Sequence, residues 1–65
     1  MSSLSARELQ CLKQAATGQT AHQIADFLGI SERTVRFHLG NAYRKLGAQC
    51  RAQAIAIAMR KNLVS

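Results

Sequence analysis

The sequence predicts an all-α domain of four helices. Three observations lead to this fold class: no proline interrupts the 65 residues, apolar residues recur at helical rather than strand spacing, and capping residues precede the apolar runs. A chain of this length forms a single domain, residues 1–65, near the lower size limit for folding alone. We expect helices over residues of about 6–16, 20–28, 31–46 and 51–62.

The first two helices are predicted from their caps. Ser5 and Glu8 form an S-x-x-E capping box, in which each side chain satisfies a free amide donor at the helix start. Thr20 is expected to cap the second helix, and Gly29 gives the backbone freedom for a tight turn after it. The residues that should face inward are Leu9, Leu12 and Ala16 in the first helix and Ile24, Ala25 and Leu28 in the second.

The third helix divides into two faces. Ser31 should cap its start, and Gly47 should end it. Because successive residues turn by about 100° around a helix, one side collects the apolar residues Val35, Leu39, Ala42 and Leu46. The opposite side, called the arginine face below, consists of Arg33, Arg36, Gly40 and Arg44, with Phe37 and Asn41 at its edge.

The segment from residue 19 to residue 46 has the sequence form of a helix-turn-helix, whose second helix enters the DNA major groove. The net charge of +6 is also uneven: residues 1–32 hold three acids and two bases, and residues 33–65 hold seven bases and no acid. This asymmetry favours an anionic partner, with nucleic acid preferred over an anionic membrane surface. The simpler alternative is an arginine face that is only solvated.

The side chains around this face have competing interpretations. A glycine within a helix is unfavourable, so Gly40 suggests that the backbone must come close to DNA there. Phe37 is expected to be partly exposed, where it could touch a thymine methyl group. For His38 we favour a phosphate contact over a packed neutral ring. Tyr43 should pack against a neighbouring helix, and His22 should be solvated.

The fourth helix is apolar nearly all round, which is typical of a helix that is covered on more than one side. One stripe, Ala54, Ile55 and Ala58, can face the core. A second stripe, which could face a partner, contains Ala52, Ala56, Met59 and, if the helix extends, Leu63. We expect a weak homodimer through this second stripe. The alternative is that Met59 and Leu63 complete the core of the monomer.

Other classes of function find no support in the sequence. No paired carboxylates, catalytic triad or phosphate-binding glycine loop suggests an enzyme, and no cofactor is expected. Cys11 and Cys50 lack the spacing of a metal site and are expected to be reduced thiols near the core. No apolar run is long enough to span a bilayer and no signal peptide is present, so we expect a cytoplasmic protein without a membrane partner.

The residues also match the pattern of a known family. The matching strings are L-S-x-R-E from Leu4, A-x-G-x-T from Ala16, I-A-x-x-L-x-I-S from Ile24, T-V-x-x-H from Thr34 and K-L-G from Lys45, followed by Arg51 and Ala54. From Leu4 to about Met59 the chain therefore resembles the LuxR/FixJ-type DNA-binding domain. The string T-V-R-F-H-L-G-N-A with R-K-L-G resembles its quorum-sensing branch, which responds to acyl-homoserine lactones.

The resemblance implies a four-helix (tetrahelical) fold in which the last helix pairs with its twin in a dimer. It implies that positions 36 and 40 face base edges and that Thr20, Thr34, His38 and Lys45 lie near phosphates. This chain departs from the family pattern twice. Position 40, which often carries a long base-reading side chain, is glycine, so Arg36 would carry more of the readout, and Gln23 replaces a usual glutamate.

Together these observations predict the effector domain of a bacterial transcriptional activator that binds a palindromic double-stranded DNA operator and can contact RNA polymerase. We favour an excised C-terminal domain over a free-standing effector. The alternative is a protein-interaction module that uses the fourth helix. The expected base contacts are Arg36, Phe37 and Gly40; the expected phosphate contacts are Thr20, Ser31, Arg33, Thr34, His38, Arg44 and Lys45; and the expected dimer contacts are Ala52, Ala56, Met59 and Leu63.

Overall fold

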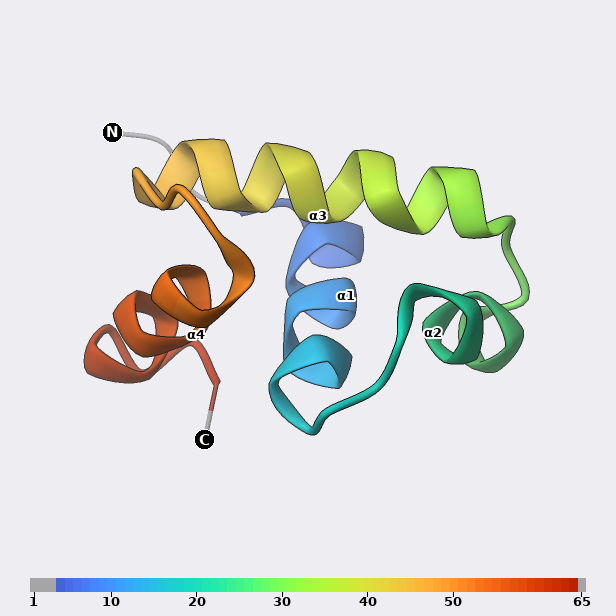
Figure 1. Cartoon of the computed structure of the whole chain (residues 1–65), viewed down its shortest axis with the longest axis horizontal. Coiled ribbons are helices and arrows are strands. Elements are labelled where there is room, and N and C mark those ends of the chain that lie inside the picture. Colours follow the sequence, from blue (N-terminus) through green and yellow to red (C-terminus); the bar gives the residue numbers. More distant parts are fainter. Residues whose placement is uncertain (1–3, 65) are drawn as a thin grey trace.

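The computed structural model describes residues 4–64, and four α-helices are found among them. They are α1 (Ala6–Ala16), α2 (Ala21–Leu28), α3 (Glu32–Leu46) and α4 (Arg51–Arg60). The long helix α3 crosses over the other three, with α1 at the centre and with α2 and α4 on either side of it (Figure 1). No helix within residues 4–64 is long and apolar enough to cross a membrane.

Side-chain caps start the first three helices, as the sequence predicted. Ser5 and Glu8 form the expected capping box. At the start of α2, Oγ1 of Thr20 accepts a hydrogen bond from the backbone N–H of Gln23, and Oε1 of Gln23 accepts one from the N–H of Thr20. Gln23, which replaces the glutamate usual in the family pattern, therefore completes a second capping box. Ser31 caps α3 through the N–H of Thr34.

Two glycines end helices in the left-handed conformation that disfavours other residues. Gly29 has φ 70° at the end of α2, and Gly47 has φ 72° at the end of α3. At the end of α2, the N–H groups of Gly29 and Ile30 both donate to the carbonyl of Ala25. The turn of the helix-turn-helix is therefore short, and it places α3 directly against α2.

The core consists of two clusters that meet along α1 and α3. The first joins α1, α2 and α3, and the second joins α1 and α4 with the segment after α4. Tyr43 packs against both clusters, which confirms its expected packing role. The first cluster is built on Cys11, Ala15, Ile24, Ala25, Val35 and Leu39, and the second on Leu12, Ala58 and Val64.

The end of α4 corrects the predicted helix boundary. The helix ends at Arg60, two residues before the predicted end, because Asn62 adopts a left-handed conformation with φ 59°. The N–H of Leu63 then donates to the carbonyl of Ala58 at 2.8 Å, so the chain turns back and Leu63 packs against the second cluster. Some burial predictions also change: Cys50 is exposed at the start of α4, and Leu9 is only partly buried and is not part of either core cluster. Ala16 and Leu28 are partly buried too, but they pack against these clusters.

Two basic side chains join elements that are far apart in the sequence. Nζ of Lys45 donates to Oε1 of Glu8 at 2.8 Å, and this carboxylate is almost fully buried. Arg51, at the first position of α4, donates from Nη2 to the carbonyl of Ala15 at 3.0 Å and also to the carbonyl of Gln19. These contacts fix the ends of α3 and α4 against α1 and the loop after it.

Candidate nucleic-acid interface

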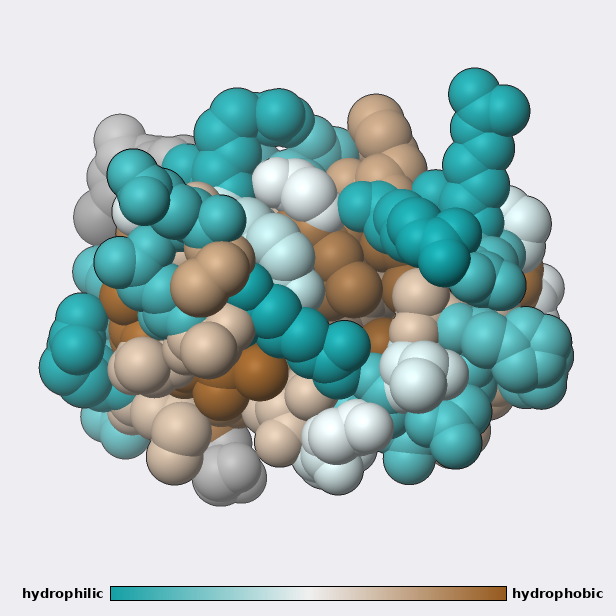
Figure 2. Space-filling model, in the orientation of Figure 1, coloured by the Kyte–Doolittle hydropathy of each residue, from teal (hydrophilic) through white to brown (hydrophobic). Residues whose placement is uncertain are grey.

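The two faces predicted for α3 are confirmed by its burial. Val35, Leu39 and Ala42 are buried against the rest of the domain. All four members of the arginine face are exposed: Arg33, Arg36, Gly40 and Arg44. Hydrophilic residues predominate along the rim where α3 runs, at the top of Figure 2. The domain therefore presents one side of a long helix that no other described segment covers.

Arg36 points outward, with 66% of its side chain exposed. Its Nη2 donates to Oε2 of Glu32, one turn earlier in the same helix. Glu32 occupies the first turn of α3, where a negative charge interacts favourably with the helix dipole. The other carboxylate oxygen of Glu32 lies 3.6 Å from Nδ1 of His22 on α2.

A similar contact orders the other end of the face. Nη2 of Arg44 donates to Oδ1 of Asn41, three residues earlier. Adding a Cβ at Gly40, between these two arginines along the helix, would meet no atom within 4 Å, so the surface there is open. The geometry leaves room for a partner to approach the helix backbone at Gly40.

Aromatic and imidazole rings flank the arginines. Phe37 is 64% exposed, which confirms its predicted exposure at the edge of the face. His38 is half-buried, and the centroid of its ring lies 5.7 Å from that of Phe37 in an edge-to-face arrangement. The exposed part of the Phe37 ring is accessible for a contact with another molecule.

The hydroxyl groups expected near phosphates lie at the starts of α2 and α3. Oγ of Ser31 accepts from the N–H of Thr34 at 3.0 Å, and the two hydroxyl oxygens are 2.7 Å apart. Thr20 is exposed and already engaged in its capping box. These side chains lie at the starts of the two helices of the helix-turn-helix, where free N–H groups also favour anions.

The seven basic residues of the second half of the chain, residues 33–65, have different positions and partners in the structure, which the charge count does not show. Three lie on the arginine face, but Arg51 points into the carbonyls after α1, a role that the sequence analysis missed. Lys45, predicted as a phosphate contact, pairs with Glu8 and has 34% of its side chain exposed. Both contacts join residues more than 30 positions apart, which local patterns do not reveal.

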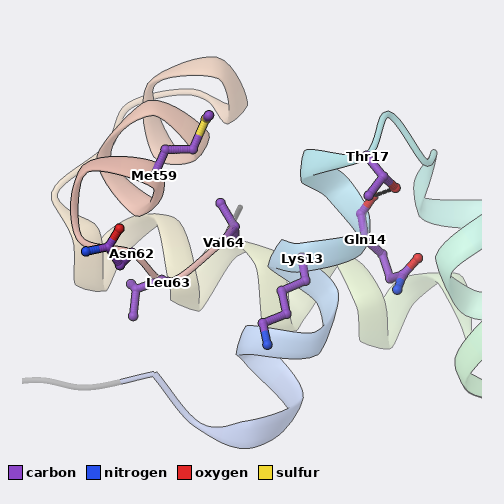
Figure 3. Close-up of a pocket in the computed structure, with 7 residues that line it drawn as sticks. All are labelled: Lys13, Gln14, Thr17, Met59, Asn62, Leu63 and Val64. Atoms are coloured by element: carbon purple, nitrogen blue, oxygen red, sulfur yellow. Dashed lines mark hydrogen bonds between the residues drawn. The ribbon is translucent and has the colours of Figure 1, made fainter.

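The outward side of α4 carries the stripe predicted for a dimer. Ala52, Ala56 and Met59 are exposed, with Met59 at 53%, whereas Ala54 and Ala58 are fully buried. Apolar residues gather over this region, at the lower left of Figure 2. Met59 also borders a hollow of about 670 Å³ between α1 and the end of α4, which Figure 3 shows together with Lys13 and Gln14 of α1. Leu63 lies beyond the end of α4 and packs against the second core cluster of its own chain, so for Leu63 the structure agrees with the alternative in which it completes the core of the monomer.

Two further features bear on the surface. Phe27 on α2 is 69% exposed, although nothing in the sequence analysis singled it out. On the same surface, His22 lies 3.5 Å from Asp26 and 3.6 Å from Glu32. Among residues 4–64 no group of histidine, cysteine, aspartate and glutamate side chains could hold a metal ion.

Comparison with known proteins identifies the family to which this fold belongs. The sequence profile of the family described as bacterial regulatory proteins, luxR family, matches residues 2–58. The chain belongs to the luxR family. The helix-turn-helix and the exposed arginine face of α3 thus lie in a domain of DNA-binding transcription regulators, a family that is not enzymatic.

Individual relatives agree with this assignment. The transcriptional activator protein VanR of Vibrio anguillarum is 55% identical over 56 residues, which cover 86% of this chain and 23% of VanR. The HTH-type quorum sensing-dependent transcriptional regulator RpaR of Rhodopseudomonas palustris is 48% identical over 61 residues, covering 94% of this chain and 25% of RpaR. This luxR-family chain thus spans about a quarter of the length of these curated relatives.

A solved structure confirms the four-helix architecture. The transcription factor GerE superposes with a TM-score of 0.91 and 35% sequence identity, over 100% of this chain and 97% of the GerE chain. The all-α, LuxR-type helix-turn-helix fold predicted from the sequence is therefore confirmed.

Proposed function

We propose that this luxR-family domain binds double-stranded DNA sequence-specifically, with α3 as the recognition helix in the major groove. The observation that carries the proposal is the exposed arginine face of α3, where three arginines share one side of the helix with an open glycine. The inner side of α3 is packed into the core, so the domain can present this face as a rigid unit.

Base reading is assigned to the middle of the face. Arg36 can donate two hydrogen bonds to O6 and N7 of a guanine, which is the commonest specific contact in the major groove. Phe37, beside it, can contact a thymine methyl group. Gly40 lets the backbone approach the base edges, because no side chain stands between them. Arg36 therefore supplies most of the direct readout.

Phosphate contacts are assigned to the rim of the face. Arg33 and Arg44 carry the charge, and the half-buried His38 lies on the same helix beside Phe37. Hydroxyl groups at the two helix starts, Thr20, Ser31 and Thr34, can donate to phosphate oxygens. Lys45 can add to these contacts from its pair with Glu8. Such contacts fix the register of the protein on DNA and make its affinity fall steeply with salt.

The proposed complex is a homodimer on a palindromic operator. The exposed stripe of Ala52, Ala56 and Met59 is apolar and small enough to let two α4 helices approach closely. The area that such short side chains can bury is modest, so the dimer is expected to be weak until DNA or another domain supports it. Two copies of α3 would then enter successive major grooves.

We assign the domain to a cytoplasmic activator of the quorum-sensing kind. VanR carries the description of a transcriptional activator and RpaR that of a quorum sensing-dependent regulator, and both resemble this chain over most of its length. An activator would have RNA polymerase as a second partner. The proposal for the whole regulator rests on these relatives, whereas the DNA-binding proposal rests on α3.

Selection of bound duplexes from a random pool tests the DNA-binding proposal. We expect enrichment of a palindrome whose half-sites lie about one helical turn apart, roughly 10 base pairs between centres. Retention should fall steeply with rising salt. Absence of any retained duplex at low salt would contradict the proposal and favour the competing function, a protein-interaction module built on the apolar outer side of α4.

A further inference from the structure

Glu32 lies beside the guanidinium group to which base reading is assigned. It is the first residue of α3, and 37% of its side chain is exposed. Its Oε2 accepts a hydrogen bond from Nη2 of Arg36, and its Oε1 lies 3.6 Å from Nδ1 of His22. The carboxylate thus lies between the two helices of the helix-turn-helix, with the base-reading arginine on one side.

We infer that Glu32 is a positioning residue that orients Arg36 for base reading and so sets the base preference of the domain. This inference rests on the proposed function, since it concerns the same face of α3. Glu32 itself need not contact DNA.

The physical reason is the freedom of an arginine side chain in solution. An exposed arginine samples many rotamers and loses that freedom when it binds a base, whereas a guanidinium group held at one end is already oriented. One Nη2 hydrogen is used by Glu32, and the remaining N–H groups can still point toward acceptors on a guanine. Orientation favours the base whose acceptors match, because a flexible side chain adapts to the wrong base more easily.

The charge of Glu32 makes this arrangement unusual for a DNA-facing surface. The chain has three acids: Glu8 is buried, while Asp26 and Glu32 lie near the surface on α2 and α3. A carboxylate near phosphates weakens binding to every sequence through repulsion. Its pairing with Arg36 supplies a sequence-specific advantage that offsets this general cost.

Two substitutions separate orientation from charge. Glu32→Asp keeps the negative charge at the start of α3 but is one methylene shorter, so it no longer reaches Arg36 as Glu32 does. Glu32→Gln keeps the reach and an acceptor oxygen but removes the charge. Asp26→Asn is the matched control, because it removes a surface carboxylate that lies 3.5 Å from His22, whereas Arg36 bonds to Glu32.

Binding of each variant of this chain is measured on the duplex selected for the wild type and on duplexes changed at the base pair whose preference Arg36→Ala abolishes. A bidentate contact gives roughly 5- to 150-fold discrimination between such duplexes. We expect Glu32→Asp to lose about fivefold of it, and Glu32→Gln and Asp26→Asn to keep most of it while binding all duplexes more tightly. In an Arg36→Ala background, Glu32→Asp should have no further effect on discrimination.

The opposite pattern, with discrimination lost in Glu32→Gln and kept in Glu32→Asp, would show that the negative charge at the start of α3, and not the reach of the side chain to Arg36, sets the preference, and would overturn the inference. Equal discrimination in all variants, with only the melting temperature changed, would reduce Glu32 to a helix-start residue and would also overturn it. A wild-type chain that retains no duplex would overturn the proposed function and this inference together, and is distinguishable from both results.

Discussion

The outer faces of α3 and α4 differ in what they expose, although both helices pack one side into the same small domain. On α3 the exposed side is charged, and the buried side carries branched residues such as Val35 and Leu39. On α4 both sides are apolar: Ala54 and Ala58 are buried, whereas Ala56 and Met59 remain in contact with solvent. A charged outer face needs no partner to be stable in water, but an apolar one leaves part of its hydrophobic stabilisation unused.

This difference teaches that the spacing of apolar residues in a sequence shows which side of a helix is buried, but not which molecule binds the exposed side. For α3 the chemistry of arginine narrows the partner to an anion with paired acceptors. For α4, alanine and methionine accept any apolar surface of suitable shape, so a second copy of this chain remains a proposal. Matched substitutions in the two helices can therefore separate effects on the stability of the fold from effects on binding.

The first prediction compares one negative charge placed on the buried side of α4 with one placed on its exposed side, and the buried charge should have the largest effect of all. Ala58→Asp buries a carboxylate at a fully covered position, which should cost several kcal/mol, on the order of 3–5, as for an uncompensated buried charge. A domain of this size has total stability of about 5 kcal/mol, so thermal melting followed by circular dichroism should show a largely unfolded protein.

Ala56→Asp is the matched substitution on the exposed side. The variant should keep the wild-type melting temperature within a few degrees but bind a two-half-site duplex more weakly, with affinity for a single half-site little changed. Equal loss of fold in both variants would mean that the exposed side of α4 is needed by the monomer. Unchanged binding to the two-half-site duplex would argue against a dimer through this stripe.

The second contrast sets an arginine of α3 against one of α4. Arg36→Ala should weaken binding to the preferred duplex by about 1–3 kcal/mol and relax one base position, without lowering the melting temperature. Arg51→Ala removes hydrogen bonds to the carbonyls of Ala15 and Gln19, so it should lower the free energy of unfolding by about 1–3 kcal/mol. Its effect on DNA binding should disappear at temperatures where the variant is fully folded.

Titrations at several salt concentrations and melting curves measure both effects. Arg60→Ala, at the exposed end of α4, is the control for loss of a positive charge alone. If Arg36→Ala leaves affinity and base preference unchanged, the arginine face is not the reading surface.

A third substitution tests whether DNA binding needs the absence of a side chain at Gly40. Gly40→Ala should stabilise the domain by about 1 kcal/mol, because alanine favours a helix and the added Cβ meets no atom of this chain. If DNA approaches the backbone at this position, the same variant should bind more weakly despite its greater stability. A gain in stability with no loss of affinity would remove the close approach from the proposal.

Most of the fold could be predicted because its signals are local. Capping residues and helical periodicity act within four residues, so α1 and the two sides of α3 follow directly from the sequence. The capping box of Gln23 was equally local, since T-x-x-Q is such a signal, and it could have been found. The early end of α4 depended on Asn62 adopting a left-handed conformation that asparagine tolerates but does not require.

The sequence predicted which residues of the candidate site are exposed, but it did not predict the hydrogen bonds that join nearby side chains to the rest of the molecule. The exposure of Arg36 and Phe37 follows from their angle around α3. The bonds of Lys45 to Glu8 and of Arg51 to Ala15 depend on helices that meet only after folding. A single sequence gives composition and spacing, but it does not reveal which of seven bases will be drawn into such contacts.

The smallest expected effect tests the bond that ties the end of α3 to α1. Hydrogen bonds from Lys45, and then from the backbone N–H of Ser5, hold the pKa of the Glu8 carboxyl below its ordinary value of 4.5. Because the pKa is lowered in the folded state, the stabilisation is complete above the unfolded pKa and is lost as the pH falls through the folded one. Urea unfolding between about pH 3 and pH 6 should therefore show a midpoint that drops on acidification in the wild type. Glu8→Gln should flatten this drop, and Asp26→Asn should leave it in place. An equal drop in the wild type and in Glu8→Gln would show that the bond between Lys45 and Glu8 does not stabilise the fold. In that case only the apolar inner side of α3 would hold the arginine face in place.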